Sequence, residues 1–386
     1  MAENASLTMR AAVYHPASQK FELCDDVEIS APGQHQVRVK VKYCGLCHSD
    51  LSVTIGNPMR DAPPIVVGHE ASGVVESVGP AVTSLKPGDH VILTPVSSCG
   101  ECYYCRRNEH SICVNAWSAM SNTFPDGTTG LSRQGETILR GLGVAALAEY
   151  VVVAEMGAIK VGQQIPLETV CVTGCALQTG VGAVLNTARI ERGATVVVSG
   201  LGGIGSAVVQ GARIARASTI VGVDPISERR VSALNFGATH VLDPVTEDVQ
   251  ATCLELTNHI GMDYAFETAG KAALIEQGIS LTRMGGTTVI VGSPKFEESL
   301  SIPNVVMFGA TEKKLCGCML GSCNSVVEIP RLVNFGQQGM LDMDAMITRR
   351  RPLEEIGEGI DDLSHCRGIR TVIEMDSGRD AKRDWS

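Results

Sequence analysis

The sequence predicts an α/β protein with two parts, a β-rich domain and a domain built on a doubly wound parallel sheet. Apolar and polar residues alternate with period two near the N-terminus, as in QVRVKVKYC at 36–44. Between about 177 and 319, buried strand patterns alternate with helical ones, which is typical of a parallel sheet. A length of 386 residues makes two domains the default. We expect the β-rich domain to comprise residues 1–176 and 320–386, with 177–319 inserted within it.

The β-rich part is predicted from short strand patterns between glycine and proline turns. Alternation extends over residues 9–45, and GHEASGVVESVG and KPGDHVIL continue it. LAEYVVVAEM, at 147–156, adds a further strand. We expect a barrel or a sandwich.

The second part begins with two expected helices in PLETVCVTGCALQTGVGAVL, at 166–185. ATVVVSGLGGIGSAVVQGARIA then predicts a buried strand, a glycine loop and a helix. STIVGVD, HVLD, MDYAFETAG and GGTTVIVGS are the next strand patterns. After about residue 320 the pattern becomes helical (SVVEIPRLVNFGQQG) and returns to a strand at RTVIEM.

Composition and charge exclude several classes of protein. Hydrophobic residues make up 44% of the chain, enough for a large core, so a disordered protein is excluded. A net charge of −10 and an aromatic content of 4% argue against a nucleic-acid partner. The N-terminus has no apolar stretch typical of a signal peptide, and the longest uncharged run is interrupted by glycines. We therefore expect a cytoplasmic protein with no membrane partner.

The fourteen cysteines fall into groups. Cys99, Cys102, Cys105 and Cys113 have the spacing C-x2-C-x2-C-x7-C, which favours a closed, structural zinc site. A redox or iron–sulfur cluster is the alternative, as is a zinc ribbon that binds nucleic acid, which the acidic charge disfavours. The cysteines outside any metal-binding pattern, best explained as small buried apolar residues, are Cys24, Cys44, Cys171, Cys253, Cys316, Cys318, Cys323 and Cys366.

A glycine-rich loop follows the buried strand of the second part. Gly200, Gly202, Gly203 and Gly205 form G-x-G-x-x-G between a strand and a helix, and Asp224 follows 19 residues after the last of them. This context predicts a Rossmann-type dinucleotide site, with the pyrophosphate at the helix N-terminus. A carboxylate at Asp224 favours NAD over NADP. A glycine turn in an unrelated α/β domain is the alternative.

A second set of metal-binding residue types is scattered along the chain. It consists of Cys47-His48-Ser49-Asp50, Gly68-His69-Glu70 and Cys175. Spacing alone does not bring these segments together. Together with KPGDHV, the four-cysteine segment, TGCALQTG, GLGGIG, DYAFETAG and IRTVIEM, they resemble the zinc-containing alcohol dehydrogenases of the medium-chain dehydrogenase/reductase superfamily, in order and spacing, over nearly the whole chain.

The resemblance implies a catalytic zinc bound by Cys47, His69 and Cys175, with a fourth position open to water or substrate. It implies that Asp50 orients His69 and that Glu70 lies behind the metal, where it transiently replaces a ligand. Ser49 would touch the substrate oxygen and start a proton relay. With the four-cysteine site, this gives two zinc ions per subunit.

The resemblance also implies cofactor contacts. His48 and Arg370 would lie near the pyrophosphate of NAD, Arg229 near the adenosine ribose and Ile204 behind the nicotinamide. The β-rich domain would be GroES-like, and the active site would lie in the cleft between the domains.

Some positions depart from the family pattern. Ser52 stands where many relatives have a histidine, so the proton relay is expected to end in water. Pro95 and Gly141 stand at positions that are usually aromatic, which predicts a wider pocket for a bulkier alcohol than ethanol. The alternative is that neighbouring side chains refill the space. Leu142 and Pro58 are expected to line the same pocket.

The expected function is NAD-dependent oxidation of a primary or secondary alcohol, reversibly, to an aldehyde or ketone. The alternative is a dehydrogenase of S-hydroxymethyl thiol adducts, which needs cations for the thiol's carboxylates; Arg140, Arg106 and Arg107 are available, without an assigned place. A non-catalytic zinc scaffold is disfavoured because all three zinc ligands are present.

The expected partners are a small-molecule alcohol or aldehyde and a second copy of the chain. The resemblance implies that a homodimer pairs through the edge strand of the second domain, for which residues 299–309 (SLSIPNVVMFG) are the candidate. A tetramer is the alternative.

Overall fold

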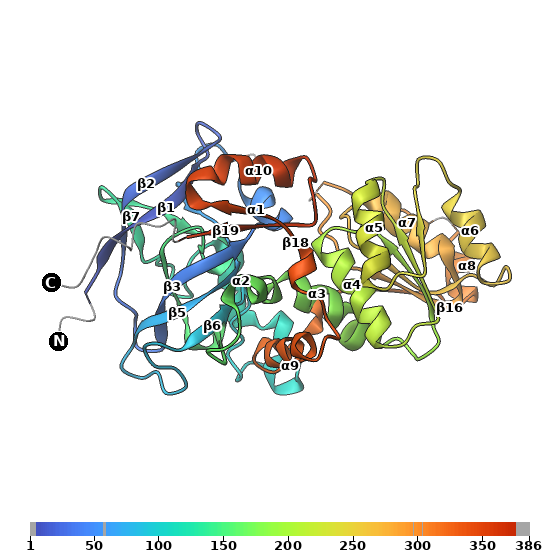
Figure 1. Ribbon diagram of the computed structural model, residues 1–386, viewed down its shortest axis with the longest axis horizontal. Coiled ribbons are helices and arrows are strands. Elements are labelled where there is room, and N and C mark those ends of the chain that lie inside the picture. Colours follow the sequence, from blue (N-terminus) through green and yellow to red (C-terminus); the bar gives the residue numbers. More distant parts are fainter. Residues whose placement is uncertain (1–4, 57–58, 296, 303, 376–386) are drawn as a thin grey trace. The chain divides into compact units, whose positions relative to one another are not determined.

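The structure is a computed structural model that describes residues 5–56, 59–295, 297–302 and 304–375. These residues form two compact units (Figure 1). Unit 1 takes its described residues from 1–175, 324–334 and 343–386, and unit 2 from 176–323 and 335–342. The predicted fold class, a β-rich domain and a parallel-sheet α/β domain, is confirmed.

Three stretches lie in a different unit from the one expected. Residues 176, 320–323 and 335–342 were expected in the β-rich domain but belong to unit 2, and 335–342 is the longest segment among them. The Gln210 side chain accepts a hydrogen bond from the backbone N–H of Asp342 at 2.7 Å, and Arg213 donates to the Met340 carbonyl at 2.7 Å. These contacts attach the segment to the helix that follows the glycine loop.

Unit 1 contains two sheets that share one apolar core. The strands of the first sheet, in spatial order, are β8 (Glu136–Thr137), β7 (Leu131–Arg133), β2 (Lys20–Ile29), β1 (Leu7–His15), β4 (Ile65–Val66) and β9 (Leu139–Arg140). The strands of the second are β11 (Ala158–Val161), β6 (His90–Leu93), β5 (Glu70–Val78), β3 (Gln36–Gly45), β19 (Arg370–Glu374) and β18 (Ile347–Pro352), with β10 (Tyr150–Ala154) also paired to β3.

The last strand of unit 1 joins the C-terminal part of the chain to the N-terminal part. In β19, Ile373 pairs with Cys44 and Val372 with Gly45 in antiparallel register. This pairing brings the start of β19 beside the residues that follow β3. The α-helices of this unit are α1 (His48–Val53), α2 (Leu167–Val170), α10 (Ile356–Ser364) and the first part of α9 (Ser325–Gln337).

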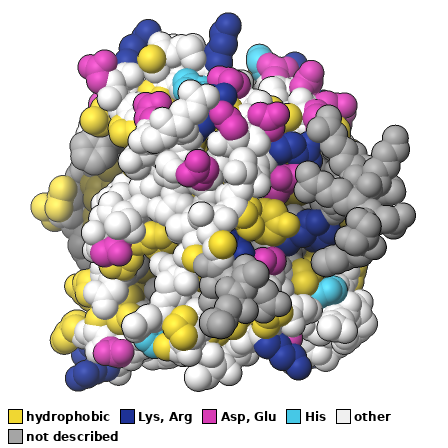
Figure 2. Space-filling view, turned by 90° about the vertical axis from the view of Figure 1, so that its left-hand side faces the viewer, with side chains coloured by type: hydrophobic (Ala, Val, Ile, Leu, Met, Phe, Trp, Pro, Cys, Tyr) yellow, Lys and Arg dark blue, Asp and Glu magenta, His cyan; other side chains and the backbone are white. Residues whose placement is uncertain are grey.

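Short 3-10 turns make up much of the remaining structure of unit 1. They are Cys105–Arg107, His110–Ile112, Val114–Ser121, Gly141–Gly143, Glu155–Gly157, Cys171–Gly174, Asp344–Met346 and Leu353–Glu355. Figure 2 shows one face of this unit, on which Lys and Arg side chains are interspersed with Asp and Glu and form no single basic patch.

Unit 2 is built on a six-stranded parallel sheet. Its order is β14 (His240–Leu242), β13 (Thr219–Val223), β12 (Thr195–Ser199), β15 (Met262–Glu267), β16 (Thr282–Ile290) and β17 (Lys314–Gly317). The central strand β12, TVVVS, is buried on both faces, as its continuous apolar run predicts.

Helices pack on this sheet in two groups (Figure 1). One group consists of α4, which contacts β12 and β13, and α5, which contacts β13 and β14; the other includes α7, which contacts β15 and β16. The helices of unit 2 are α3 (Ala176–Gly182) with the π-helical turn Ala183–Ala188, α4 (Gly203–Ile214), α5 (Ser227–Phe236), α6 (Val249–Glu255), α7 (Ala272–Leu281) and α8 (Val305–Ala310), besides the 3-10 turn Leu320–Ser322.

The predicted edge strand at 299–309 is wrong. Residues 305–310 of this region form helix α8, which begins after Asn304, whose side chain accepts a hydrogen bond from the Met307 N–H at 3.2 Å. The sheet edges are instead β14 and β17. An asparagine cap satisfies a free N–H group at the start of a helix, a role that has no counterpart in a strand. The apolar residues around Asn304 favoured the prediction of a strand instead.

Within the described residues, no single helix is long and apolar enough to cross a membrane. Only the consecutive helical segments Leu167–Gly174 and Ala176–Ala188, taken together, have the required length and composition.

Candidate functional site

Three metal-binding side chains from distant parts of the sequence converge in unit 1. The ligand atoms of Cys47, His69 and Cys175 all lie within 4.8 Å of one another, and all three residues are buried. Cys47 precedes α1, His69 lies between β4 and β5, and Cys175 follows the 3-10 turn Cys171–Gly174. A histidine nitrogen and two sulfurs fit zinc with a fourth position left open, so the donor chemistry agrees with the prediction.

Asp50 holds two of these segments in place. This fully buried carboxylate accepts hydrogen bonds from the Cys47 N–H through Oδ2 and from the Gly68 N–H through Oδ1, both at 3.0 Å. Its Oδ1 also lies 3.0 Å from Nδ1 of His69. Nε2 is therefore the ring nitrogen available to a metal, as expected for a ligand histidine oriented by a carboxylate.

Arg370 and Glu70 form a buried ion pair beside Cys47. Nε of Arg370 lies 3.2 Å from Oε1 of Glu70, and Nη2 lies 3.7 Å from the Cys47 sulfur. Nη1 donates to the carbonyl of Leu46 at 3.3 Å. From the sequence, Glu70 was expected at the metal and Arg370 at the cofactor, and their contact with each other was not predicted.

The pKa values of the two cysteines in the cluster are shifted in opposite directions. A hydrogen bond with Cys175 lowers the pKa of Cys47 well below its usual value, and Arg370 and His69 lower it further against the effect of burial. The same hydrogen bond, together with burial, raises the pKa of Cys175. Burial opposes the charged form of His69, but Asp50 outweighs it and raises the pKa of the imidazole. Of the two thiols, that of Cys47 is therefore the more readily ionised.

The other predicted residues of α1 lie toward solvent. His48 is exposed, and Ser49 is partly exposed with its hydroxyl 3.8 Å from the Cys47 sulfur. Ser52 is exposed as well, and its hydroxyl donates to the His48 carbonyl at 3.2 Å. Ser49 thus lies next to a metal-binding side chain, and Ser52 offers no imidazole.

Gly141 does not open a pocket, contrary to the wider-pocket reading of this position. A Cβ atom there would lie 2.7 Å from Cγ1 of Val67 and 2.8 Å from the carbonyl oxygen of Val66. The neighbouring strand therefore fills the space, which is the alternative considered above. Leu142 and Pro95 are partly exposed, and Pro58 lies outside the described residues.

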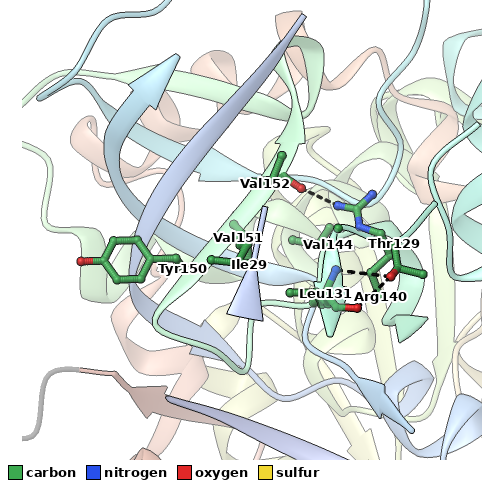
Figure 3. Close-up of a pocket in the computed structure, with 10 residues that line it drawn as sticks. Ile29, Thr129, Leu131, Arg140, Val144, Tyr150, Val151 and Val152 are labelled. Atoms are coloured by element: carbon green, nitrogen blue, oxygen red, sulfur yellow. Dashed lines mark hydrogen bonds between the residues drawn. The ribbon is translucent and has the colours of Figure 1, made fainter. Parts of the chain in front are cut away.

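A small cavity in unit 1 lies beside a buried arginine (Figure 3). Besides Arg140, it is lined mainly by apolar residues such as Ile29 and Val144. Arg140 is 4% exposed, donates to the Val152 carbonyl at 2.6 Å and stacks 3.6 Å from the ring centre of Phe124. Burial lowers its pKa to about 9. Arg140 is therefore buried, and its guanidinium group is occupied by contacts within the fold.

The four-cysteine segment forms a compact cluster. The sulfurs of Cys99, Cys102, Cys105 and Cys113 lie within 4.8 Å of one another, on a segment of short 3-10 turns. The backbone N–H of Cys99 donates to the Cys113 sulfur, and that of Cys102 to the Cys99 sulfur, each at 3.4 Å. A backbone hydrogen bond from Cys105 is the main cause that lowers the pKa of Cys102 to about 6. Four converging thiols fit a structural zinc site.

The glycine loop of unit 2 has the shape that a dinucleotide site needs. Gly200 has a φ of +95°, and a Cβ atom at Gly205 would lie 1.9 Å from the Gly200 carbonyl oxygen. At Gly202 the nearest atom to an added Cβ is 3.6 Å away, so the backbone there is open to a close ligand. Helix α4 begins at Gly203, which places the partly exposed Ile204 in its first turn. These features fit a pyrophosphate at the helix N-terminus.

Asp224 follows strand β13, and its carboxylate links the glycine loop to the segment after β13 through hydrogen bonds. Its Oδ2 accepts from the Leu201 N–H and its Oδ1 from the Ile226 N–H, both at 2.8 Å. Nη1 of Arg229 lies 3.8 Å from Oδ2. The structure thus brings Asp224, Arg229 and the loop together.

Comparisons with known families agree with this arrangement. Residues 33–166 match the alcohol dehydrogenase GroES-like domain, and residues 203–336 match the zinc-binding dehydrogenase domain. Together the two matches span most of the chain. The protein is a zinc-type alcohol dehydrogenase by family, and the chain belongs to the medium-chain dehydrogenase/reductase superfamily.

Individual relatives cover nearly the whole chain. A probable S-(hydroxymethyl)glutathione dehydrogenase 1 of Schizosaccharomyces pombe is 33% identical over 97% of this chain and 98% of its own. The crystal structure of an alcohol dehydrogenase zinc-binding domain protein from Burkholderia ambifaria is 34% identical, with a TM-score of 0.89, and benzyl alcohol dehydrogenase from Acinetobacter calcoaceticus is 29% identical, with a TM-score of 0.88. Each match covers 96% of this chain and 100% of the other.

Proposed function

We propose that this oxidoreductase is a zinc-dependent alcohol dehydrogenase that uses NAD to oxidise a primary or secondary alcohol, reversibly, to an aldehyde or ketone. The observation that carries the proposal is the buried cluster of Cys47, His69 and Cys175, with Asp50 fixing the imidazole. Zinc bound there would supply a Lewis acid that acidifies an alcohol, and a bound nicotinamide would supply the electron sink.

The chain's own residues would position the substrate and move its proton. Three protein ligands leave room for a substrate oxygen, and the Ser49 hydroxyl beside Cys47 would accept the alcohol proton. At the position where relatives carry an imidazole, the hydroxyl of Ser52 is directed to the His48 carbonyl. The proton would therefore pass from Ser49 to water. His48, Glu70 and Arg370 would balance charge around the cofactor and the metal.

Asp224 supports NAD over NADP. Its buried carboxylate lies at the glycine loop, where it would accept hydrogen bonds from ribose and repel a 2′-phosphate. Removing like-charge repulsion in Asp224→Gly is expected to raise NADP use relative to NAD by at least about tenfold. Steady-state kinetics with both cofactors measure this ratio, and an unchanged ratio would sink the role of Asp224.

A substrate bulkier than ethanol is the second part of the proposal. Pro95 has no aromatic ring to fill the pocket, and a 29% identical relative is a benzyl alcohol dehydrogenase. Gly141 gives no support, since Val66 and Val67 occupy the space beside it.

A dehydrogenase of S-hydroxymethyl thiol adducts is the second candidate, favoured by the 33% identical relative from Schizosaccharomyces pombe. Such a substrate needs cations for its carboxylates. Arg140 is buried, which leaves Arg106 and Arg107, both exposed in the four-cysteine segment.

The deciding experiment is NADH formation across a graded panel of alcohols, from ethanol through linear chains to benzylic and terpene-like alcohols. The same assay is run with glutathione plus formaldehyde and with formaldehyde alone. Turnover that rises with alcohol size supports the first candidate. Turnover only with the thiol adduct supports the second, and Arg106→Gln with Arg107→Gln should then raise KM for the adduct.

We further propose two zinc ions per subunit, a homodimer and a cytoplasmic location, with no nucleic-acid or membrane partner. The exposed apolar residues Val305 and Val306 of α8, close in sequence to edge strand β17, support pairing in this region. Metal analysis and light scattering test the zinc content and the dimer.

A further inference from the structure

A third group of metal-binding side chains lies on the β1–β2 hairpin, outside the site described above. The ligand atoms of His15, Glu22 and Cys24 all lie within 4.8 Å of one another. Nε2 of His15 is 3.3 Å from a Glu22 carboxylate oxygen. From the sequence, Cys24 was expected to be a small buried apolar residue, and no role was predicted for His15 or Glu22.

The strand register explains why these residues meet. In the antiparallel pair, Val13 lies opposite Glu22 and Ala11 opposite Cys24. Side chains two residues apart share a face, so His15 lies on the same face as Glu22 and diagonal to it. The exposed side-chain fraction rises from the buried Cys24 through 28% for His15 to 54% for Glu22. The group thus runs from the core to the surface.

The hydrogen bonding leaves this group incomplete. Nε2 of His15 is buried, and its 3.3 Å contact with the Glu22 carboxylate lacks hydrogen-bond geometry, so among the described residues it makes no hydrogen bond. The Cys24 sulfur makes one weak contact, 3.7 Å from the Glu22 carbonyl. A buried polar atom without a partner is costly, which points to a missing ligand.

A cavity borders the group at His15, which lines it together with residues such as Arg133 and Glu136; Glu22 and Cys24 are not among the lining residues. It has a volume of about 180 Å³ and provides space beside His15 for water molecules as further ligands.

We propose that His15, Glu22 and Cys24 form a further metal site that binds a borderline divalent cation of the Zn²⁺ or Co²⁺ class. Imidazole nitrogen, carboxylate oxygen and thiolate sulfur are all ligands that such cations accept, and three of them leave a position for water. The cation would complete the coordination of His15 and link the two strands of the hairpin near its turn.

Two features weaken this site relative to the two cysteine clusters. Arg133 lies 3.4 Å from Glu22 and 2.6 Å from Asp26, so it competes with a cation for the Glu22 carboxylate. Burial raises the pKa of the Cys24 thiol to about 11, so a cation must displace its proton. Binding should therefore be reversible and should release a proton.

The test is titration of the zinc-loaded, full-length protein with Co²⁺, followed by calorimetry, absorbance and metal analysis. The wild type should take up one additional Co²⁺ per chain without losing zinc and should show a thiolate-to-cobalt charge-transfer band. Cys24→Ser should abolish the band, and His15→Gln should weaken binding at least about tenfold. Cys316→Ser, a partly buried cysteine of unit 2, is the matched control and should behave as the wild type.

Other results overturn the proposal. One is no Co²⁺ uptake beyond exchange with resident zinc. Another is equal uptake with the same band in the wild type and Cys24→Ser. His15→Gln changes a partly exposed side chain, so equal Co²⁺ affinity in this folded variant also counts against the site.

Discussion

The two main cysteine sites of unit 1 are assembled in opposite ways. The four-cysteine cluster comes from one segment, residues 99–113, and its sulfurs accept N–H groups of that segment. The cluster of Cys47, His69 and Cys175 comes from three distant segments and is buried among charged partners. A local site depends on its own loop, whereas a remote site depends on the whole domain that brings its ligands together.

This difference also separates two kinds of chemistry. Four cysteine sulfurs would complete the tetrahedral coordination of a zinc ion, so the local cluster fits a structural role. The remote cluster offers three side chains, which hydrogen bonds to Asp50 hold in place beside the ion pair of Glu70 and Arg370. Mutations in the two sites should therefore affect different measurements.

Loss of one remote ligand should have the largest effect. Cys47→Ala is expected to lower kcat by at least about a thousandfold, because Lewis-acid catalysis contributes several kcal/mol. The fold should survive, as judged by the thermal transition. The matched control is Cys171→Ala, a buried cysteine outside the ligand set. Turnover near the wild-type rate in Cys47→Ala would show that the remote cluster is not the catalytic site.

Loss of one local ligand should instead affect stability. Cys113→Ser is expected to cost about 3 kcal/mol, or roughly 6–12 °C in Tm, because a structural metal site is lost. The rate per folded molecule should change little. Calorimetry and active-site titration measure the two quantities. A large loss of kcat with an unchanged Tm would assign this cluster to catalysis.

Asp50→Asn tests the framework of the remote site. An amide has one oxygen acceptor, whereas the carboxylate serves two N–H groups and His69. Zinc affinity of the remote site should fall roughly 10–100-fold. Competition with a chelator measures this, with the exposed Asp61→Asn as control. Equal zinc retention in both variants contradicts the role of Asp50.

The smallest effect is expected at Gly141, in the turn that contacts α1. Gly141→Ala should destabilise the protein by about 1–3 kcal/mol through overpacking against Val67 and Val66. Denaturant unfolding measures this loss. Gly309→Ala, where an added Cβ meets no atom within 4 Å, is the control. If stability were unchanged and the preference for large alcohols were altered, the hypothesis of an open pocket at Gly141 would be supported again.

The sequence predicted those features that depend on local spacing. The four cysteines, the glycine loop with Asp224 and the alternation of strands and helices all follow from periodicity and residue spacing. The remote ligands were predictable only through family resemblance, because no local pattern shows that Cys47, His69 and Cys175 meet.

The remaining differences arise from tertiary contacts. The contact of Arg370 with Glu70 depends on the register between β19 and β3, which spans most of the chain. The space beside Gly141 depends on where Val67 packs. At residues 305–310, an apolar run formed a helix because Asn304 caps it, so hydrophobicity alone gave the wrong element.

The position of Arg370 on the last strand has a consequence for biosynthesis. Arg370 contacts the sulfur of Cys47 across 323 residues of sequence. At translation rates of about 5–20 residues per second, these two residues are made roughly 16–65 s apart. During that interval Cys47 and Glu70 lack their cationic neighbour. The remote site can thus be completed only after nearly the entire polypeptide has left the ribosome, whereas the four cysteines of residues 99–113 are all available to a metal ion early in synthesis.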